Sequence, residues 1–262
     1  MLYRLFEQRL AAPTVFILCL PLQLEFMMST VQAFATRNRL MDELPARQYG
    51  RMLSACELVT LSPRQVVCDQ DGVFTHVYFP LTASISLMIK VTEHPPLGMV
   101  LVGSEGMLGA SLALGVSAAP LRAVVQGGGT ALRISVPGFI ALLAENPAIG
   151  VVLGRYLYVL MEQLSQTAAC NRFHEVEARL VRWLLLTHDR AHADSFQLTH
   201  LGLAEILGVQ RSAVTIAAGM LQQNGLISYS RGFITIIDRA GLERLSCECY
   251  GLLLADYQRQ IA

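Results

Sequence analysis

The sequence has no excess of charge of either sign and almost no lysine. Of its 262 residues, 20 are basic and 20 are acidic, and every basic residue except Lys90 is arginine. A chain with this balance has no overall positive field, which excludes recruitment of an anionic partner through net charge. The arginine bias fits either phosphate recognition or genomic base composition, and we favour the second. Any anion recognition must therefore arise from a local arrangement of side chains.

A CxxC pair and a regular cysteine framework are also absent. The six cysteines are spread over the chain, at positions 19, 56, 68, 170, 247 and 249. Such scatter is typical of reduced thiols rather than of a disulfide scaffold. Cys247 and Cys249 would point to different sides of a helix, so they make a poor metal pair without another ligand. Cys68 and His76 could bind haem or a metal, but a packed thiol and an ordinary strand histidine are commoner. We predict neither a metal site nor a resident cofactor.

Common enzyme motifs are missing as well. The chain has no GxSxG elbow, no HExxH helix, no glycine-rich phosphate loop and no cluster of paired carboxylates. The apolar stretch at 15–20 is short and flanked by Pro13 and Pro21, well below the roughly 18 residues that a membrane-spanning helix needs. The sequence therefore predicts neither an enzyme nor a membrane protein.

The first half of the chain carries short segments with strand character. After a helical pattern that begins near residue 38 and is broken by Pro45, β-branched and apolar residues predict strands at 66–68, 77–79, 84–89, 97–102, 121–126 and 131–135. Turn signals such as Asp71-Gly72 and the glycines at 127–129 separate them. Because the spacing leaves no room for crossover helices, we expect an antiparallel β-roll or jelly roll.

A long helix is predicted after Pro147. Apolar residues recur there at steps of three or four, at Ile149, Leu153, Tyr156, Leu160, Leu164 and Thr167. Such a seam can pack on the chain's own roll or on the same helix of a second subunit, and periodicity does not separate the two. A helix of about 24 residues, roughly 36 Å long, exceeds what the small roll needs for cover. We therefore favour a dimerisation helix.

The next segments predict a helix-turn-helix followed by a hairpin. A second helix runs from Val176 to about Thr187, and a polar loop follows it. Thr199 is a good N-cap for a helix to Leu207, and Gly208 provides a tight exit before another helix begins. Strands at 226–229 and 233–237 then form a wing about the turn at 230–232.

Charge is distributed unevenly around this motif. Between Gly208 and Ile237 the chain has two arginines and no acidic residue, which suits contact with phosphates. The second helix of such a pair places its N-terminal residues in the major groove of DNA. The candidate DNA contacts are Thr199, Gln210, Arg211, Ser212, Thr215 and Arg231. The alternative is a signalling or interaction module whose winged helix docks a protein partner.

At this point the chain resembles the CRP-FNR family of transcription regulators, over about residues 38–245. The matching positions are Leu198, Thr199, Leu203, Ala204, Leu207, Gly208, Val209, Arg211, Val214, Leu221, Gly225, Leu226, Ile227, Ile234, Thr235 and Ile236. The resemblance implies a cyclic-nucleotide-binding-like roll, a homodimer and double-stranded DNA as the partner, and it admits RNA polymerase as another. Arg211 matches the family's base-contacting arginine, which binds the O6 and N7 of guanine. Ser212 and Ile216 depart from the best-known members, so the preferred half-site is open.

The sensor end departs further from the family pattern. Cyclic-AMP binders pair Gly-Glu with a later Arg-Ser or Arg-Thr, whereas this chain has Gly109-Ala110 and Pro120-Leu121 at those places. Without that carboxylate and arginine, cyclic AMP is not the expected effector, and its identity is unknown. Gly109 and Arg122 are the candidate effector-binding residues, although for Arg122 we favour a plain surface role. The scattered cysteines do not supply the set that iron-sulfur sensing uses.

The predicted fold class is α+β, with an N-terminal antiparallel β-roll (jelly roll), a long dimerisation helix and a C-terminal winged helix-turn-helix. We assign the roll to residues 38–146, the long helix to 147–171, the DNA-binding domain to 172–245 and a helical tail to 246–262.

Residues 1–37 form a separate extension. Arg4 and Arg9, the apolar stretch and Ala33-Phe34-Ala35 together resemble an export signal. Alternatively, translation begins at Met27 or Met28, or the extension is unstructured. We favour these alternatives and a cytoplasmic location, because export would contradict a DNA-binding C-terminus.

Overall fold

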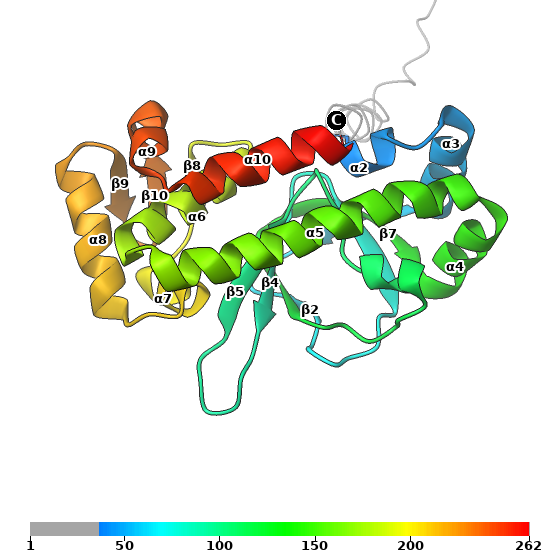
Figure 1. The fold of residues 1–262 in the computed structure, drawn as a ribbon, viewed down its shortest axis with the longest axis horizontal. Helices are drawn as coiled ribbons and strands as arrows, with labels where there is room; N and C mark the ends of the chain where they lie inside the picture. The colour runs from blue at the N-terminus through cyan, green and yellow to red at the C-terminus, as the bar shows by residue number, and fades with distance from the viewer. Residues whose placement is uncertain (1–36, 262) are drawn as a thin grey trace, which may run out of the picture. The chain divides into compact units, whose positions relative to one another are not determined.

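The computed structural model describes residues 37–261, so the predicted extension at 1–37 lies outside the described residues except for Arg37. Within this range no single helix is both long enough and apolar enough to cross a membrane. Figure 1 shows the elements, which are in chain order α2 (Arg39–Asp42), α3 (Ala46–Ala55), β1 (Glu57–Leu61), β2 (Val66–Cys68), β3 (His76–Pro80), β4 (Ser84–Ile89), β5 (Leu97–Val102), η1 (Ala110–Leu114), β6 (Arg122–Gly127), β7 (Gly129–Ser135), α4 (Val136–Glu145), α5 (Pro147–Phe173), α6 (Val176–Ala191), β8 (Ser195–Gln197), α7 (His200–Leu207), α8 (Arg211–Gln223), β9 (Ile227–Ser230), β10 (Phe233–Ile236), α9 (Arg239–Leu245) and α10 (Glu248–Ile261).

The N-terminal half forms a β-roll of two antiparallel sheets. One sheet has the strand order β1-β7-β3 and the other β2-β6-β4-β5, and every neighbouring pair is antiparallel. The predicted antiparallel roll is thus confirmed. The sequence does not indicate β1, because Leu58 is exposed, Val59 is half-buried and only Leu61 is buried. Without a regular alternation of buried and exposed residues, this edge strand has no period to detect.

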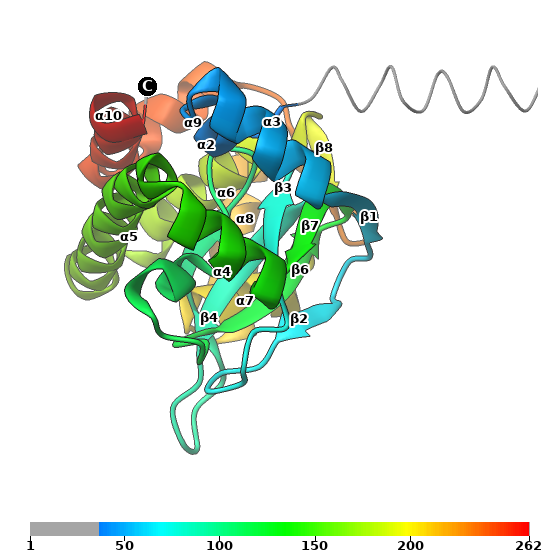
Figure 2. The same ribbon diagram turned by 90° about the vertical axis from the view of Figure 1, so that its right-hand side faces the viewer.

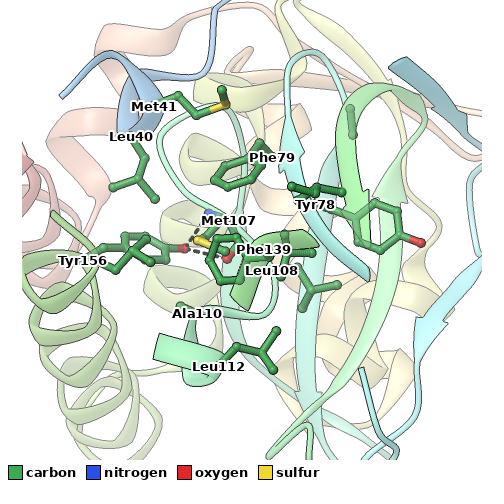
Figure 3. Packing of buried hydrophobic residues seen from close by; sticks show 14 of the residues in the cluster. Leu40, Met41, Tyr78, Phe79, Met107, Leu108, Ala110, Leu112, Phe139 and Tyr156 are labelled. Carbon is green, nitrogen blue, oxygen red and sulfur yellow. Dashed lines mark hydrogen bonds between the residues drawn. The ribbon is translucent and has the colours of Figure 1, made fainter. Parts of the chain in front are cut away.

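The long helix α5 closes the roll with the apolar seam seen in its sequence. Ile149, Leu153 and Tyr156 are at most 2% exposed and belong to the core of the roll. Figure 3 shows Tyr156 reaching from the helix to Met107. Its hydroxyl donates to the Met107 carbonyl and accepts from the Met107 amide, both at 3.1 Å. The sequence left open whether this seam packs on the chain's own roll or on the same helix of a second subunit. In the structure it packs on the roll, so a contact between two α5 helices must use another face.

The predicted C-terminal tail contains α10, which packs along α5. Figures 1 and 2 both show the two helices side by side. Ile261 packs in the core of the roll, whereas Tyr250 and Leu253 pack in the core of the C-terminal domain. The last helix therefore contacts both domains.

The core of the C-terminal domain lies between α6, α7, α8 and a small sheet. Trp183 and Leu184 of α6 are at most 2% exposed at its centre. The sheet has the order β8-β10-β9, so the predicted hairpin gains a third strand. The sequence does not indicate β8, because Phe196 is the single buried residue of its three. The polar loop predicted at 188–195 is shorter in the structure, since α6 continues to Ala191 and β8 begins at Ser195.

A buried ion pair joins the roll to this domain. Glu105, after β5, and Arg190, near the end of α6, have side chains that are 5% and 6% exposed, and Arg190 Nη2 lies 2.6 Å from Glu105 Oε1. Arg190 also donates to the Leu186 carbonyl, and the Gly103 amide donates to Glu105. Because a buried charge is costly without its partner, this pair constrains how α6 meets the roll.

Candidate nucleic-acid interface

The helices α7 and α8 have the geometry of a helix-turn-helix. The Thr199 hydroxyl caps α7 by accepting from the Gly202 amide at 3.1 Å. The helix ends at Gly208, whose φ of +63° lies in the left-handed region that favours glycine. Between α7 and α8 the chain bends by 112°, within the range of about 90–120° typical of this motif. The predicted helix-turn-helix is present.

One face of α8 is buried and the other is open to solvent. Val214 and Leu221 are fully buried and pack in the domain core. The predicted contact residues at the start of the helix are all exposed, namely Gln210, Arg211, Ser212 and Thr215. Ile216 is 65% exposed on the same face, and an apolar group of this kind can contact a thymine methyl. The start of α8 thus presents exposed charged and hydrogen-bonding groups beside an exposed apolar one.

The wing is a tight hairpin between β9 and β10. Ser230 pairs with Phe233, which leaves Arg231 and Gly232 as a two-residue turn with φ values of +50° and +85°. Positive φ at both positions is the signature of a type I′ turn, whose twist matches that of the strands. The turn places the exposed Arg231 side chain at the tip of the wing.

Thr199 differs from the other predicted contacts. It is half-buried and its hydroxyl is already used as the cap of α7. It also lines a cleft of about 410 Å³ between the roll and α7. Thr199 therefore stabilises the start of α7.

His200 is a residue at this interface that sequence reasoning missed. Its ring stacks on Tyr229 of the wing with the ring centroids 4.0 Å apart, and its Nδ1 lies 3.1 Å from the Thr215 hydroxyl of α8. Burial and the nearby positive charge of Arg211 lower the pKa of His200. The ring therefore connects α7, α8 and the wing. Its only sequence signal is its position directly after the cap residue Thr199.

We expect an NMR pH titration of the free protein to give His200 a midpoint below the ordinary histidine pKa of about 6.5. The folded state then disfavours the protonated ring more than the unfolded chain does, so the free energy of unfolding should fall as the pH drops below that ordinary value. Arg211→Ala should raise the midpoint, because it removes a positive charge. His200→Gln identifies the signal by its loss. A midpoint at or above the ordinary value would contradict this account.

A separate cavity of about 170 Å³ lies between the roll and α5. The four positions compared with the cyclic-AMP pattern line it, namely Gly109, which matches that pattern, and Ala110, Pro120 and Leu121, which depart from it. The other lining residues are Phe74, Leu87, Val100, Met107, Leu108, Ser111, Leu157, Leu160, Met161 and Leu164. With no charged side chain in its lining, this cavity suits an apolar group rather than a phosphate.

Arg122, the other candidate effector residue, lies elsewhere. It lines the cleft beside α7, and its Nε lies 3.0 Å from the Asp69 carboxylate. The structure therefore does not bring Gly109 and Arg122 into one site.

Comparison with known proteins identifies the C-terminal domain. Residues 178–245 match the family model of the Crp-like helix-turn-helix domain. No curated protein sequence matches the chain.

Several solved structures resemble most of the described chain. A transcriptional regulator of the crp/fnr family from Eubacterium rectale has 15% identity and a TM-score of 0.61, over 79% of this chain and 96% of that one. The c-di-GMP responsive global regulator CLP of Xanthomonas campestris has 18% identity and a TM-score of 0.60, over 73% and 99%. FixK2 from Bradyrhizobium japonicum has 13% identity and a TM-score of 0.62, over 73% and 98%. The resemblance to CRP-FNR regulators and the predicted fold class are confirmed.

Proposed function

We propose that this chain, which carries a Crp-like helix-turn-helix domain within the fold of CRP-FNR regulators, is a sequence-specific DNA-binding transcription regulator that acts as a dimer. The observation that carries the proposal is the exposed polar start of α8 beside a wing tipped by Arg231. The stretch from Gly208 to Ile237 that contains both has no acidic residue, so this surface attracts phosphates although the chain is neutral. Such a regulator works in the cytoplasm.

The five exposed contact residues each have a part in this proposal, whereas Thr199 acts as the cap of α7. Arg211 forms two hydrogen bonds to the O6 and N7 of a guanine. Gln210, Ser212 and Thr215 contact neighbouring bases or phosphates from the same exposed face. Arg231 neutralises a phosphate beside the groove, which adds affinity without sequence preference.

The exposed face of α5 supplies a contact for a second copy of the chain. Among its exposed residues, six apolar or small ones recur at steps of three and four, namely Val151, Gly154, Tyr158, Met161, Ser165 and Ala168. This is the a and d spacing of a two-stranded coiled coil. A Cβ added at Gly154 would meet nothing within 4 Å, so a second helix can approach closely there. We assign this stripe to the α5 helix of the partner subunit.

The sensor cavity favours an apolar effector over cyclic AMP. Met161 lines the cavity and is also part of the exposed stripe on α5. An effector that fills the cavity can therefore act on the helix that joins the two subunits, provided that it binds one arrangement of the dimer better than another. RNA polymerase is a proposed partner on the family resemblance alone.

The test is selection of bound duplexes from a random library by the purified chain, followed by titration of the selected duplex against salt. We expect a two-fold symmetric motif with half-sites roughly 34–36 Å apart, bound by a dimer in sedimentation analysis. Affinity should fall steeply with salt, since neutralised phosphates release counterions. A chain that yields no motif and shows no salt-sensitive binding would favour the alternative in which the winged helix docks a protein.

A further inference from the structure

Four side chains that can bind a metal meet where the long helix joins the DNA-binding domain. Cys170 and His174 lie at the end of α5, whereas Cys247 and Cys249 lie at the start of α10. One ligand atom from each lies within 4.8 Å of every other. The three cysteines are buried, with Ala178 of α6 packed against them. The cluster thus lies at the meeting point of α5, α6 and α10.

The local backbone explains how Cys247 and Cys249 reach the same centre. If both were helical, they would point to different sides. Cys247 instead precedes α10, and its carbonyl accepts from the Tyr250 amide at 3.1 Å, as in the first turn of a helix. The direction of its side chain is therefore not fixed by the turn of about 100° per residue of α10, and the side chain can point to the same centre as Cys249. The further ligands that this pair lacks in the local sequence come from α5.

Two of the six separations between the ligand atoms match those of a single tetrahedral ion. Cys170 Sγ and Cys247 Sγ are 3.8 Å apart, and Cys249 Sγ and His174 Nδ1 are 3.5 Å apart. Two thiolates on one tetrahedral Zn²⁺ lie about 3.8 Å apart, and a thiolate and an imidazole nitrogen about 3.5 Å apart, given the usual bond lengths. The remaining pairs of ligand atoms lie within 4.8 Å of one another, so binding one ion requires them to approach each other by roughly 1 Å at most.

The groups around the cluster are those that support metal ligands. The Glu248 carboxylate lies 3.3 Å from His174 Nε2, so it can hold the proton on Nε2 and leave the Nδ1 lone pair facing the cysteines. This carboxylate–histidine arrangement orients the ring and makes it a better ligand. Gln166 Nε2 donates to Cys249 Sγ at 2.9 Å, which stabilises a thiolate.

A buried arginine supplies the matching charge. Arg182 is 5% exposed, and the side-chain hydrogen bond of its guanidinium is to the Thr167 hydroxyl at 3.4 Å. Among residues 37–261 it has no carboxylate within ion-pair distance. The hydrogen bond to Cys247 and burial raise the pKa of the Cys170 thiol, whereas the nearby positive charge of Arg182 acts in the opposite direction. Three thiolates and one dication carry a net charge of −1, which would compensate the buried arginine.

We propose that Cys170, His174, Cys247 and Cys249 bind one Zn²⁺ ion in a closed tetrahedral site. Binding releases the three thiol protons to solvent. Two of the ligands lie at the end of α5, before α6, and the other two lie at the start of α10, after α9. The ion would therefore join the segments that lead into and out of the winged helix-turn-helix domain. The ion thereby fixes the geometry of the turn between α5 and α6. The site does not depend on the proposed DNA function, although its effect on the orientation of α8 does.

The test begins with elemental analysis of the full chain, purified under reducing conditions. We expect one zinc ion per chain. Titration of the metal-free chain with Co²⁺ should give the visible bands of tetrahedral thiolate coordination and saturate at one ion. Cys170→Ser and Cys249→Ser should each abolish these bands. Each should also lower the affinity for Co²⁺ at least 10-fold. Cys68→Ser, a cysteine outside the cluster, is the matched control and should bind as the unaltered chain does.

A second variant separates metal binding from correct folding. Glu248→Gln keeps all four ligands and changes only the group behind His174. We expect one ion still to bind, with an affinity lowered about 10- to 100-fold. The matched control is Glu243→Gln, which alters an exposed carboxylate on α9 that pairs with Arg239. This variant should leave the affinity for the metal unchanged.

Two results would overturn the site. One is a reduced chain with no bound metal and no cobalt spectrum. The other is a chain that holds no metal and forms a Cys170–Cys247 disulfide instead. Because these measurements contain no DNA, failure to select a DNA motif would leave the zinc site standing. Absence of metal would equally leave the proposed regulator function standing.

Discussion

Replacement of Arg190 by methionine is expected to lower the free energy of unfolding by about 3–5 kcal/mol, because it leaves Glu105 as an uncompensated buried charge. Both side chains are at most 6% exposed, and Arg190 bonds to Glu105 through Nε at 2.8 Å as well as through Nη2. Burial disfavours the charged guanidinium, yet the charge of Glu105 and its hydrogen bond keep the pKa of Arg190 above its ordinary value. Urea unfolding followed by tryptophan fluorescence measures the effect, since Trp183 lies on the same helix.

The double variant Glu105→Gln with Arg190→Met should recover much of this loss, because it leaves no unpaired charge. The matched control is the exposed pair between Arg51 and Glu145, whose side chains are 41% and 55% exposed. Arg51→Met should cost at most about 1 kcal/mol, since water screens an exposed pair. An Arg190→Met chain as stable as the control variant would show that this pair does not join the two domains.

Replacement of Arg211 by alanine is expected to weaken binding to the selected DNA site by about 1–3 kcal/mol, or roughly 5- to 150-fold in affinity. The side chain is exposed at the start of α8, where bonds to a guanine would be lost without disturbing the buried face of the helix. Preference at a single base pair of each half-site should relax. Competition binding with duplexes changed at each position in turn measures both effects.

Two further variants interpret the result. Arg211→Lys keeps the charge but not the paired donors, so it should lose base preference while nearly retaining the salt dependence. Arg244→Ala removes an arginine whose side chain is 72% exposed on α9, and it should leave base preference unchanged. If Arg211→Ala weakened binding equally on every sequence, Arg211 would be a phosphate contact and another residue would read the site.

The helix-turn-helix and its wing are predictable because their signals are local. The cap at Thr199, the exit at Gly208 and the turn at Arg231-Gly232 each act within a few residues. The contribution of His200 is not local, since its ring meets Tyr229 and Thr215 only after α7, α8 and the wing have packed together. No spacing rule connects these three positions.

The sequence alone determined the succession of an antiparallel roll, a long helix and a winged helix-turn-helix, and the polar start of α8, since hydrophobic period, caps and turns operate over short distances. Tertiary structure alone decided which face of α5 covers the roll, because a periodic apolar face can pack on any complementary apolar surface. It also decided that Cys170 and Cys247, which are 77 residues apart, come into contact. Side chains so distant in the chain become neighbours only through packing of the whole domain. The local sequence around each cysteine therefore does not predict its contact with the other.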